Sequence, residues 1–237
     1  MERNVEFLDW GTLSYKEAWD EQQSLHSNNV KIKSSNNKVD VEHQVPTKHF
    51  LIFCEHNPVY TLGKSGSINH LLLKKDELER AGVEFYKINR GGDITYHGPG
   101  QIVGYPIFDL DDFFHDVHKY VRFLEEVIIR TLKEFDINGI RIEGFTGVWL
   151  AGTDYLPQRK ICAIGVHLSR WVTMHGFALN VNTDLDYFSG IIPCGIEDKT
   201  KDVTSIEKEL GKTVDFEHVK HNVKQKFKMV FDLEFLN

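Results

Sequence analysis

One cysteine of this chain lies where its thiol could act as a nucleophile. Cys194 stands in the run Gly190-Ile-Ile-Pro-Cys-Gly-Ile196, where the flanking proline and glycine predict a turn that exposes the side chain. The nucleophilic form is the thiolate, and at an ordinary pKa of about 8.5 only a small fraction of a thiol is ionised at pH 7. Cys194 therefore needs a nearby cation or base to be reactive; the alternative is a small buried apolar residue.

Three side chains could supply that cation or base. Lys160 opens the apolar stretch Lys160-Ile-Cys-Ala-Ile-Gly-Val166 and is expected at the mouth of a buried strand, although simple surface exposure is the alternative. For His97 and His175, each followed by glycine, the alternative is a structural hydrogen bond. Full ionisation of the thiol gains only about 30-fold, about 2 kcal/mol, so acyl transfer also needs oxyanion donors, which we expect near Cys194 and Gly176.

The run Arg90-Gly-Gly-Asp-Ile-Thr-Tyr-His-Gly-Pro-Gly-Gln101 places four glycines and a proline between two apolar stretches. Glycine lets a ligand approach the main chain closely, and Pro99 restricts the backbone, so the run predicts a shaped, fairly rigid binding loop rather than an ordinary turn. It matches neither the Gly-x-Gly-x-x-Gly pattern of dinucleotide sites nor the Gly-Lys-Ser/Thr of a P-loop.

Apolar periodicity predicts the elements that must position these residues. The positions from Val117 to Phe135 follow a 3.6-residue period and predict the clearest helix. A capping box of Ser14 and Glu17 predicts a helix to about His26. Further helices are expected at 76–81, 205–210 and 215–231. Strands are expected at 5–10, 49–54, 83–88, 102–108, 140–143, 148–150, 160–168 and 171–180.

These elements favour an α+β fold with a mixed sheet flanked by helices. The strands are too irregularly spaced for strict βαβ alternation, and the length fits a single domain over residues 1–237. The stretch Ser27–Thr47 is polar and lacks a sustained apolar period. It is predicted to be an exposed loop or a partly disordered insertion.

Composition excludes several classes of protein. With 41% hydrophobic and 27% charged residues the chain is typical of a soluble globular protein, and its formal net charge of −7 argues against nucleic-acid binding. No apolar run approaches the roughly 18 residues of a membrane span, so no membrane partner is expected and a cytoplasmic location is the default. Cys54, Cys162 and Cys194 form no Cys-x-x-Cys pair, so neither a disulfide framework nor a metal site is indicated.

Taken together, the motifs resemble those of the lipoyl(octanoyl) transferases. The glycine run is preceded by Glu55-His-Asn-Pro-Val-Tyr-Thr-Leu-Gly63 and followed by Lys160-Ile-Cys-Ala-Ile-Gly165. The segments His175-Gly-Phe-Ala-Leu-Asn-Val181, Pro193-Cys-Gly-Ile196 and Val203-Thr-Ser205 then appear in the order of the family. The resemblance covers roughly Phe50 to Ser205.

The resemblance implies transfer of an octanoyl group from octanoyl-acyl carrier protein to a lysine of a lipoyl domain. The implied acceptors are 2-oxoacid dehydrogenase subunits and the glycine-cleavage H protein, and no cofactor is implied. The cysteine at position 194 would carry the acyl thioester, and Lys160 would lower its pKa. The fold implied is that of biotin and lipoate ligases. Substrate binding is implied for Arg90, Gly91, Gly92, Asp93, Ile94, Thr95, Tyr96, His97, Ala163, Ile164, Gly165, Gly176, Phe177 and Ala178.

An acidic carrier protein would need a local basic patch on this acidic chain. Candidates near the site are Lys64, Arg90, Arg159, Lys160 and Arg170, and a second set is Lys220, Lys224, Lys226 and Lys228, for which a solvated helix face is the alternative.

Three other functions stay open. An ATP-dependent lipoate or biotin ligase would need adenylate-binding residues and no nucleophilic thiol. A non-catalytic carrier-protein-binding module would need neither Lys160 nor Cys194. A Cys/His hydrolase would admit the water that a transferase must exclude from its thioester.

Overall fold

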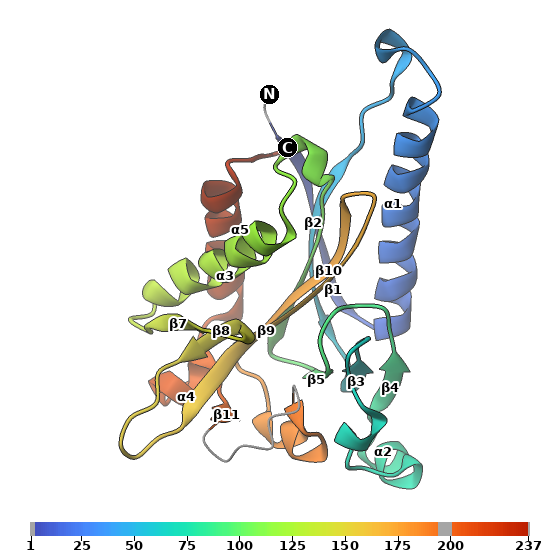
Figure 1. Cartoon of the computed structure of the whole chain (residues 1–237). Coiled ribbons are helices and arrows are strands. Elements are labelled where there is room, and N and C mark those ends of the chain that lie inside the picture. Colours follow the sequence, from blue (N-terminus) through green and yellow to red (C-terminus); the bar gives the residue numbers. More distant parts are fainter. Residues whose placement is uncertain (1–2, 194–200, 237) are drawn as a thin grey trace.

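The computed structural model describes residues 3–193 and 201–236, which form a large mixed sheet with helices on both faces (Figure 1). In spatial order its strands are β12 (Glu234–Phe235), β1 (Asn4–Leu13), β2 (His49–His56), β6 (Gln101–Ile107), β10 (Val172–Asn180), β9 (Gln158–Ser169), β8 (Phe145–Leu150) and β7 (Gly139–Ile142). A further strand, β11 (Lys201–Val203), pairs with the first residues of β9, beyond the end of β10. In this sheet, parallel pairs join β12 to β1, β1 to β2 and β11 to β9, and the other pairs are antiparallel.

The helices divide between the two faces of this sheet. In Figure 1, α1 (Tyr15–Asn36) covers one face alone, and α3 (Val117–Lys133) and α5 (Phe216–Phe231) pack together on the other. The shorter α4 (Ile206–Leu210) precedes α5, and α2 (Lys75–Ala81) lies beside a second, smaller sheet. Short 3-10 helices occur at Val41–His43, Ile68–His70, Leu110–Asp112 and Leu185–Gly190.

Strand β2 shows why both faces of the sheet are covered. Alternate side chains of a strand point to opposite faces, so a continuously apolar strand requires a core on each side. Leu51 and Phe53 belong to the core under α3 and α5, whereas Phe50, Ile52 and Cys54 belong to the core under α1. The predicted mixed sheet with flanking helices is confirmed.

The smaller sheet consists of β4 (Glu84–Lys87), β3 (Val59–Leu62) and β5 (Ile94–His97), and it lies below α1 in Figure 1. Its strand β5 corrects the prediction that the whole glycine run is a loop. Residues Ile94–His97 pair with β3, so only the glycine-rich flanks remain irregular. The β-branched Ile94 and Thr95 and the aromatic Tyr96 explain the strand, since such residues favour extended backbone.

The long helix α1 corrects the first part of the prediction for Ser27–Thr47, whereas residues 37–46 form an exposed connection, as predicted. The capping box of Ser14 and Glu17 is present, but the helix continues to Asn36 instead of ending near His26. Its inward face is made of Ala18, Gln22, His26 and Asn29, which recur at helical spacing. Because most of these buried side chains are polar, the sequence shows no apolar period there, although the helical period is real.

Asn29 fixes the second half of α1 to the chain that leads into β2. Its side-chain nitrogen donates to the carbonyl of Lys48 at 2.6 Å, and its side-chain oxygen accepts from the N–H of Lys48 at 3.0 Å. Both hydrogen bonds are part-buried, so this amide replaces a backbone partner for Lys48.

The other predicted helices and strands are present with small differences at their ends. Gly82 and Gly211 end α2 and α4 in the left-handed conformation that the sequence analysis expects of a C-terminal glycine. Strands β3, β5, β11 and β12 were not anticipated. In the described part of the chain no helix is long and apolar enough to span a membrane.

We predict that Asn29→Ala lowers the free energy of unfolding by about 1–3 kcal/mol, because it leaves the backbone of Lys48 without two partners. Urea denaturation of the purified protein measures this change. Asn28→Ala is the matched control, since Asn28 is exposed on the neighbouring helix position. An equal effect of both substitutions would show that the amide contacts contribute nothing specific.

Candidate active site

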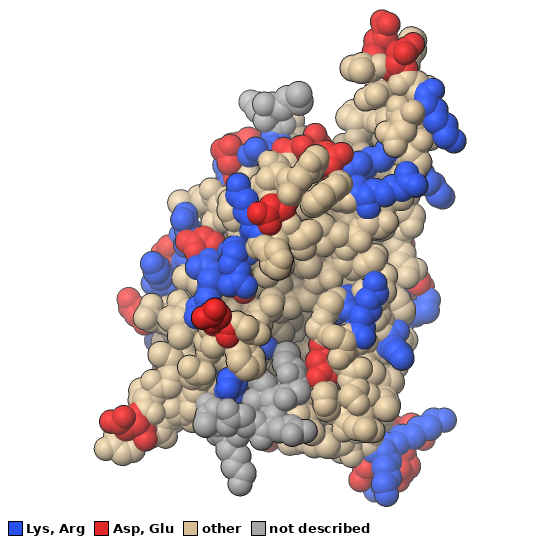
Figure 2. All heavy atoms as spheres, in the orientation of Figure 1, with Lys and Arg blue, Asp and Glu red and all other residues tan. Residues whose placement is uncertain are grey.

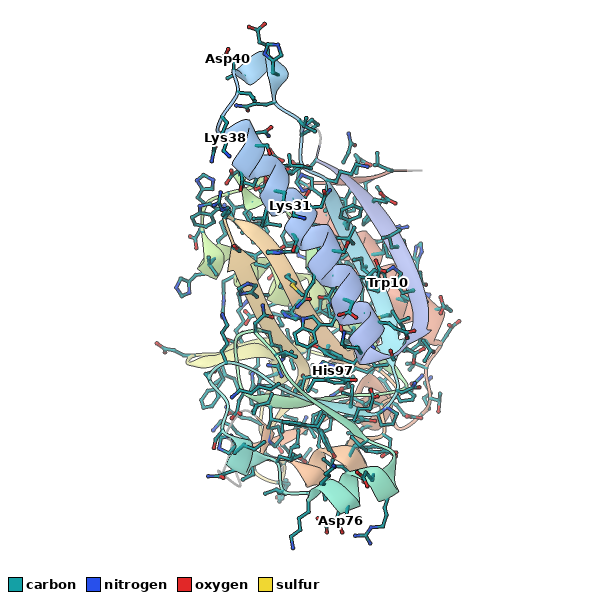
Figure 3. The ribbon with its side chains drawn as sticks, turned by 90° about the vertical axis from the view of Figure 1, so that its right-hand side faces the viewer. Trp10, Lys31, Lys38, Asp40, Asp76 and His97 are labelled. Carbon is teal, nitrogen blue, oxygen red and sulfur yellow. The ribbon has the colours of Figure 1, made fainter. Side chains whose placement is uncertain are left out.

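A narrow cavity lies on the α1 face of the large sheet, where the smaller sheet meets it. It gathers side chains and backbone from three predicted segments that are far apart in the sequence. Figure 3 shows His97, a residue of one of these segments, between the lower end of α1 and the smaller sheet. The predicted residues that line the cavity are Arg90, Gly92, Asp93, Ile94, Thr95, His97, Lys160, Ala163, Ile164, Gly165, Gly176, Phe177 and Ala178.

Small residues make room for the cavity. Gly176 and Gly165 pair across β10 and β9, and Ala178 and Ala163 pair beside them. A Cβ atom on Gly165 would lie 2.7 Å from the carbonyl oxygen of Gly91, and one on Gly176 would lie 2.2 Å from that of Gly104. Only glycine fits where the backbone of another segment comes this close.

The glycine run covers the cavity and is fastened to it by Arg90. The Gly91 N–H donates to the carbonyl of Val166 at 2.9 Å, which joins the run to β9. The buried guanidinium of Arg90 donates to the Thr61 carbonyl at 2.7 Å and to the Gly91 carbonyl at 3.0 Å. The Arg90 side chain therefore stabilises the conformation of the glycine run over the cavity.

Two predicted binding residues lie beside the cavity rather than on it. Gly91 contributes the backbone hydrogen bond to β9 and does not line the cavity. Tyr96 points the opposite way, where its ring stacks on Tyr187 with the ring centres 4.8 Å apart. Both residues therefore support the residues that line the cavity without lining it themselves.

His97 and His175 are buried and neutral. His97 hydrogen bonds to Gln101 at 2.9 Å and to Thr61 at 3.2 Å, and His175 bonds to Asn89 at 2.8 Å. Burial, reinforced for both by the charge of Arg90, lowers the pKa of His175 to about 3 and holds the pKa of His97 well below its usual value. These contacts favour the structural role for both residues over that of a general base at neutral pH.

The inner end of the cavity is formed by residues that the sequence analysis missed. Tyr15, Val103 and Tyr105 line it together with His97. The ring of Tyr15 stacks on the His97 ring with 5.9 Å between centres, and the Tyr105 hydroxyl bonds to His56 at 2.6 Å. Tyr15 opens a helix that the capping box did locate, but no sequence signal connects it to residues 80 or more positions away.

Lys160 is buried at the other end of the cavity, with 6% of its surface exposed. Its ammonium nitrogen lies 4.6 Å from the centre of the Trp149 ring, and its carbonyl accepts from the Thr204 N–H at 2.9 Å. The alternative of a simply exposed lysine is therefore wrong. Cys54 and Cys162 are buried, and burial raises the pKa of both thiols well above the ordinary value.

Cys194 lies outside the described residues, as do residues 195–200. The described chain ends at Pro193, shortly after the Ile192 N–H donates to the carbonyl of His70 at 2.8 Å. It resumes at Lys201 in β11, where Val203 pairs with Lys160.

The candidate basic residues differ from one another in their surroundings. Arg90 and Arg159 are buried, and Arg159 forms an ion pair with Glu209 at 2.8 Å. On α5, Lys220, Lys226 and Lys228 each pair with a carboxylate, and Lys224 lies over the Phe7 ring. Lys64 is exposed next to the glycine run. Figure 2 shows charges of both signs interspersed on the drawn face rather than one basic patch.

The fold and the cavity together define a lipoyl-ligase type of catalytic domain. Over residues 15–228 the chain matches the lipoyl protein ligase A/B catalytic domain, and it belongs to this family. The octanoyltransferase of Cytophaga hutchinsonii is 54% identical over 235 residues, covering 99% of this chain and 96% of that protein. The octanoyltransferase of Flavobacterium psychrophilum is 55% identical over 234 residues, covering 98% of each. The resemblance predicted from the motifs is confirmed.

Solved structures confirm the fold. A bipartite lipoate protein ligase from Thermoplasma acidophilum superposes with a TM-score of 0.70 at 16% identity, covering 99% of this chain and 86% of that one. A lipoate-protein ligase A with bound ATP gives a TM-score of 0.66 at 16% identity, covering 100% and 88%. At this identity the likeness extends to the fold and not to the reaction.

The buried histidines predict a loss of stability in mild acid. Burial lowers the pKa of His56 to about 4 and of His175 to about 3, whereas an unfolded histidine titrates near 6.5. As pH falls below about 6.5 the unfolded state binds protons first, so each histidine removes about 1.4 kcal/mol per pH unit from the free energy of unfolding. Urea denaturation between pH 7 and pH 5 measures this slope.

His56→Gln should make that slope shallower, because one depressed pKa is removed. His118→Gln is the control, since His118 is exposed and should leave the slope unchanged. A slope that is the same in all three proteins would contradict a neutral buried His56.

Proposed function

We propose that this chain transfers an octanoyl group from octanoyl-acyl carrier protein to a lysine of a lipoyl domain, through a thioester on Cys194. Octanoyl transfer is the activity named for its relatives at 54% and 55% identity. The observation that carries the proposal is the burial of Lys160 on the same cavity that gathers the predicted binding segments. The acceptors proposed are 2-oxoacid dehydrogenase subunits and the glycine-cleavage H protein, in the cytoplasm.

The proposed reaction has two acyl transfers. The Cys194 thiolate attacks the thioester carbonyl of the donor, a new carbon–sulfur bond forms, and the carrier thiolate leaves and takes up a proton. The amine of the acceptor lysine then attacks the octanoyl-enzyme, and the amine loses a proton as the Cys194 thiolate leaves. Exchange between two thioesters is nearly balanced in energy and amide formation is downhill, so neither step requires ATP.

Lys160 would make the thiolate available at neutral pH. A neutral Lys160 accepts the Cys194 proton, and the resulting ammonium attracts the thiolate. For two charges about 4 Å apart at an effective dielectric near 20, this attraction is about 4 kcal/mol before the cost of desolvation. The buried position of Lys160 supports this role, because water screens a buried pair less than an exposed one.

The cavity suits a fatty acyl chain. From Lys160 to Gly165 the strand β9 rises by five steps, roughly 15 Å, which matches the combined length of a lysine side chain and an extended chain of eight carbons. Tyr15 and Tyr105 close the inner end. Each methylene buried there contributes about 0.8 kcal/mol, so the cavity can select a chain by its length.

The two-step reaction distinguishes the proposed transferase from two alternative enzymes. An ATP-dependent ligase on this fold would need ATP and would leave no acyl group on a cysteine. A Cys/His hydrolase would need a histidine that accepts protons at neutral pH, whereas burial lowers the pKa of His175 to about 3. The proposal therefore depends on an ATP-independent acyl-enzyme.

We expect intact-protein mass spectrometry to detect one octanoyl group on the protein after incubation with octanoyl-acyl carrier protein in the absence of ATP. Cys194→Ser should abolish the adduct, and Lys160→Met should slow its formation by up to about 30-fold, because the thiolate loses its cation and the ionised fraction of the thiol falls to its ordinary value. Cys54→Ala is the control and should retain the adduct, since its buried thiol does not line the cavity. An adduct that persists in Cys194→Ser, or that requires ATP, would refute the mechanism.

We further expect Ala163→Val to shift the preference of the enzyme toward shorter acyl chains. Valine would fill part of the cavity, and loss of one or two buried methylenes costs about 1–2 kcal/mol, roughly tenfold in kcat/KM for the octanoyl donor. Steady-state rates with butanoyl, hexanoyl and octanoyl donors measure the shift. Ala151→Val is the control on an exposed position, and equal profiles for both variants would place the acyl chain elsewhere.

A further inference from the structure

The direction of the Lys160 side chain depends on a β-bulge. Strand β8 pairs Val148 with Cys162 but Trp149 with Lys160, so Ile161 is an extra residue on β9. Ile161 and Cys162 are both fully buried in the core under α3 and α5. Regular alternation would send Lys160 to the same face as Cys162, whereas the bulge returns it to the cavity face.

Trp149 meets Lys160 on that face. Its neighbours Val148 and Leu150 point into the α3/α5 core, so alternation directs the Trp149 ring to the opposite side of β8. The ring is fully buried, its N–H donates to the carbonyl of Phe145 at 3.3 Å, and its centre lies 4.6 Å from the Lys160 nitrogen. This distance is typical of a cation–π contact, which is strongest for tryptophan.

Gly147 and Glu125 fix strand β8 where it pairs with the bulge of β9. Gly147 has a φ of +117°, and a Cβ atom there would lie 2.5 Å from the carbonyl oxygen of Cys162. Its N–H donates to the fully buried Glu125 carboxylate at 3.1 Å, and Arg122 and Arg141 each pair with the same carboxylate at 3.0 Å. Helix α3 thereby fixes the strand opposite the bulge.

We infer that Trp149 is a positioning residue that holds the Lys160 ammonium in the cavity through the face of its indole ring. This inference rests on the proposed role of Lys160 in acyl transfer. An aromatic face stabilises an ammonium without accepting its proton and without cancelling its charge. A carboxylate in the same place would stabilise the ammonium more strongly but would also repel a neighbouring thiolate. The contact with the indole therefore does not neutralise the positive charge of Lys160.

Nuclear magnetic resonance tests the contact directly. In protein labelled with ¹³C at the lysine ε-carbon, the Lys160 signal is the one that disappears in Lys160→Arg. We expect its ε-protons to be shifted upfield by the indole ring, and the shift to shrink in Trp149→Phe. Trp10→Phe is the matched control and should leave the signal in place. An unshifted Lys160 signal in the native protein, or one that Trp149→Phe does not move, would overturn the inference.

The same spectra in a Cys194→Ala background separate this inference from the proposed function. The indole contact requires no thiol, so the upfield shift should persist there. If the shift persists while the native protein forms no octanoyl adduct, the proposed function fails and the contact stands.

The kinetics of Trp149→Phe distinguish a positioning role of Trp149 from a general loss of structure. Trp149→Phe weakens the cation–π contact, and we expect kcat to fall about three- to tenfold with KM for the octanoyl donor unchanged. The pH at which iodoacetamide alkylation of Cys194 reaches half its maximum should rise, because the thiolate loses part of its partner. A fall in kcat with an unchanged alkylation profile would show that Trp149 acts only through packing.

Discussion

The burial of the Lys160 ammonium group is the constraint on which the arrangement of the site depends. Removing a charge from water costs several kcal/mol unless other groups compensate, and Lys160 is 6% exposed. The face of Trp149 provides part of that compensation, and the proposed mechanism adds the negative charge of a thiolate. The bulge at Ile161, the close approach of Gly147 to Cys162 and the buried Glu125 then follow as the means of keeping this lysine aimed at the cavity.

The cavity exists because β9 and β10 carry small residues where they line it. Glycine and alanine on β9 and β10 remove side chains from one face of a sheet that is otherwise densely packed, and the glycine run closes over the space. Arg90 holds that run by bonds to backbone carbonyls, so this cation serves the architecture rather than the docking of a partner. Selectivity for an acyl chain would come from shape, since His97 and His175 are neutral where they line the cavity.

Much of this arrangement could be predicted from residue patterns, and the exceptions have physical causes. Most residues that the family resemblance implies for substrate binding line the cavity, and the glycine run and Lys160 stand out in the sequence alone because their residue types do not depend on distant contacts. The length of α1 could not be predicted, because its buried face carries Gln22, His26 and Asn29 instead of apolar residues. Tyr15 and Trp149 were missed for another reason: each acts through a partner that only the folded sheet brings near.

Locating the acyl chain in the octanoyl-enzyme is the most direct test of the proposed acyl site. In protein carrying an octanoyl group with a ¹³C-labelled terminal methyl, nuclear Overhauser contacts report which side chains surround the end of the chain. The arrangement of the cavity predicts contacts from that methyl to Tyr15 and Val103 at its inner end. Contacts to the core under α3 and α5, or to no buried residue at all, would contradict an acyl site on the α1 face of the sheet.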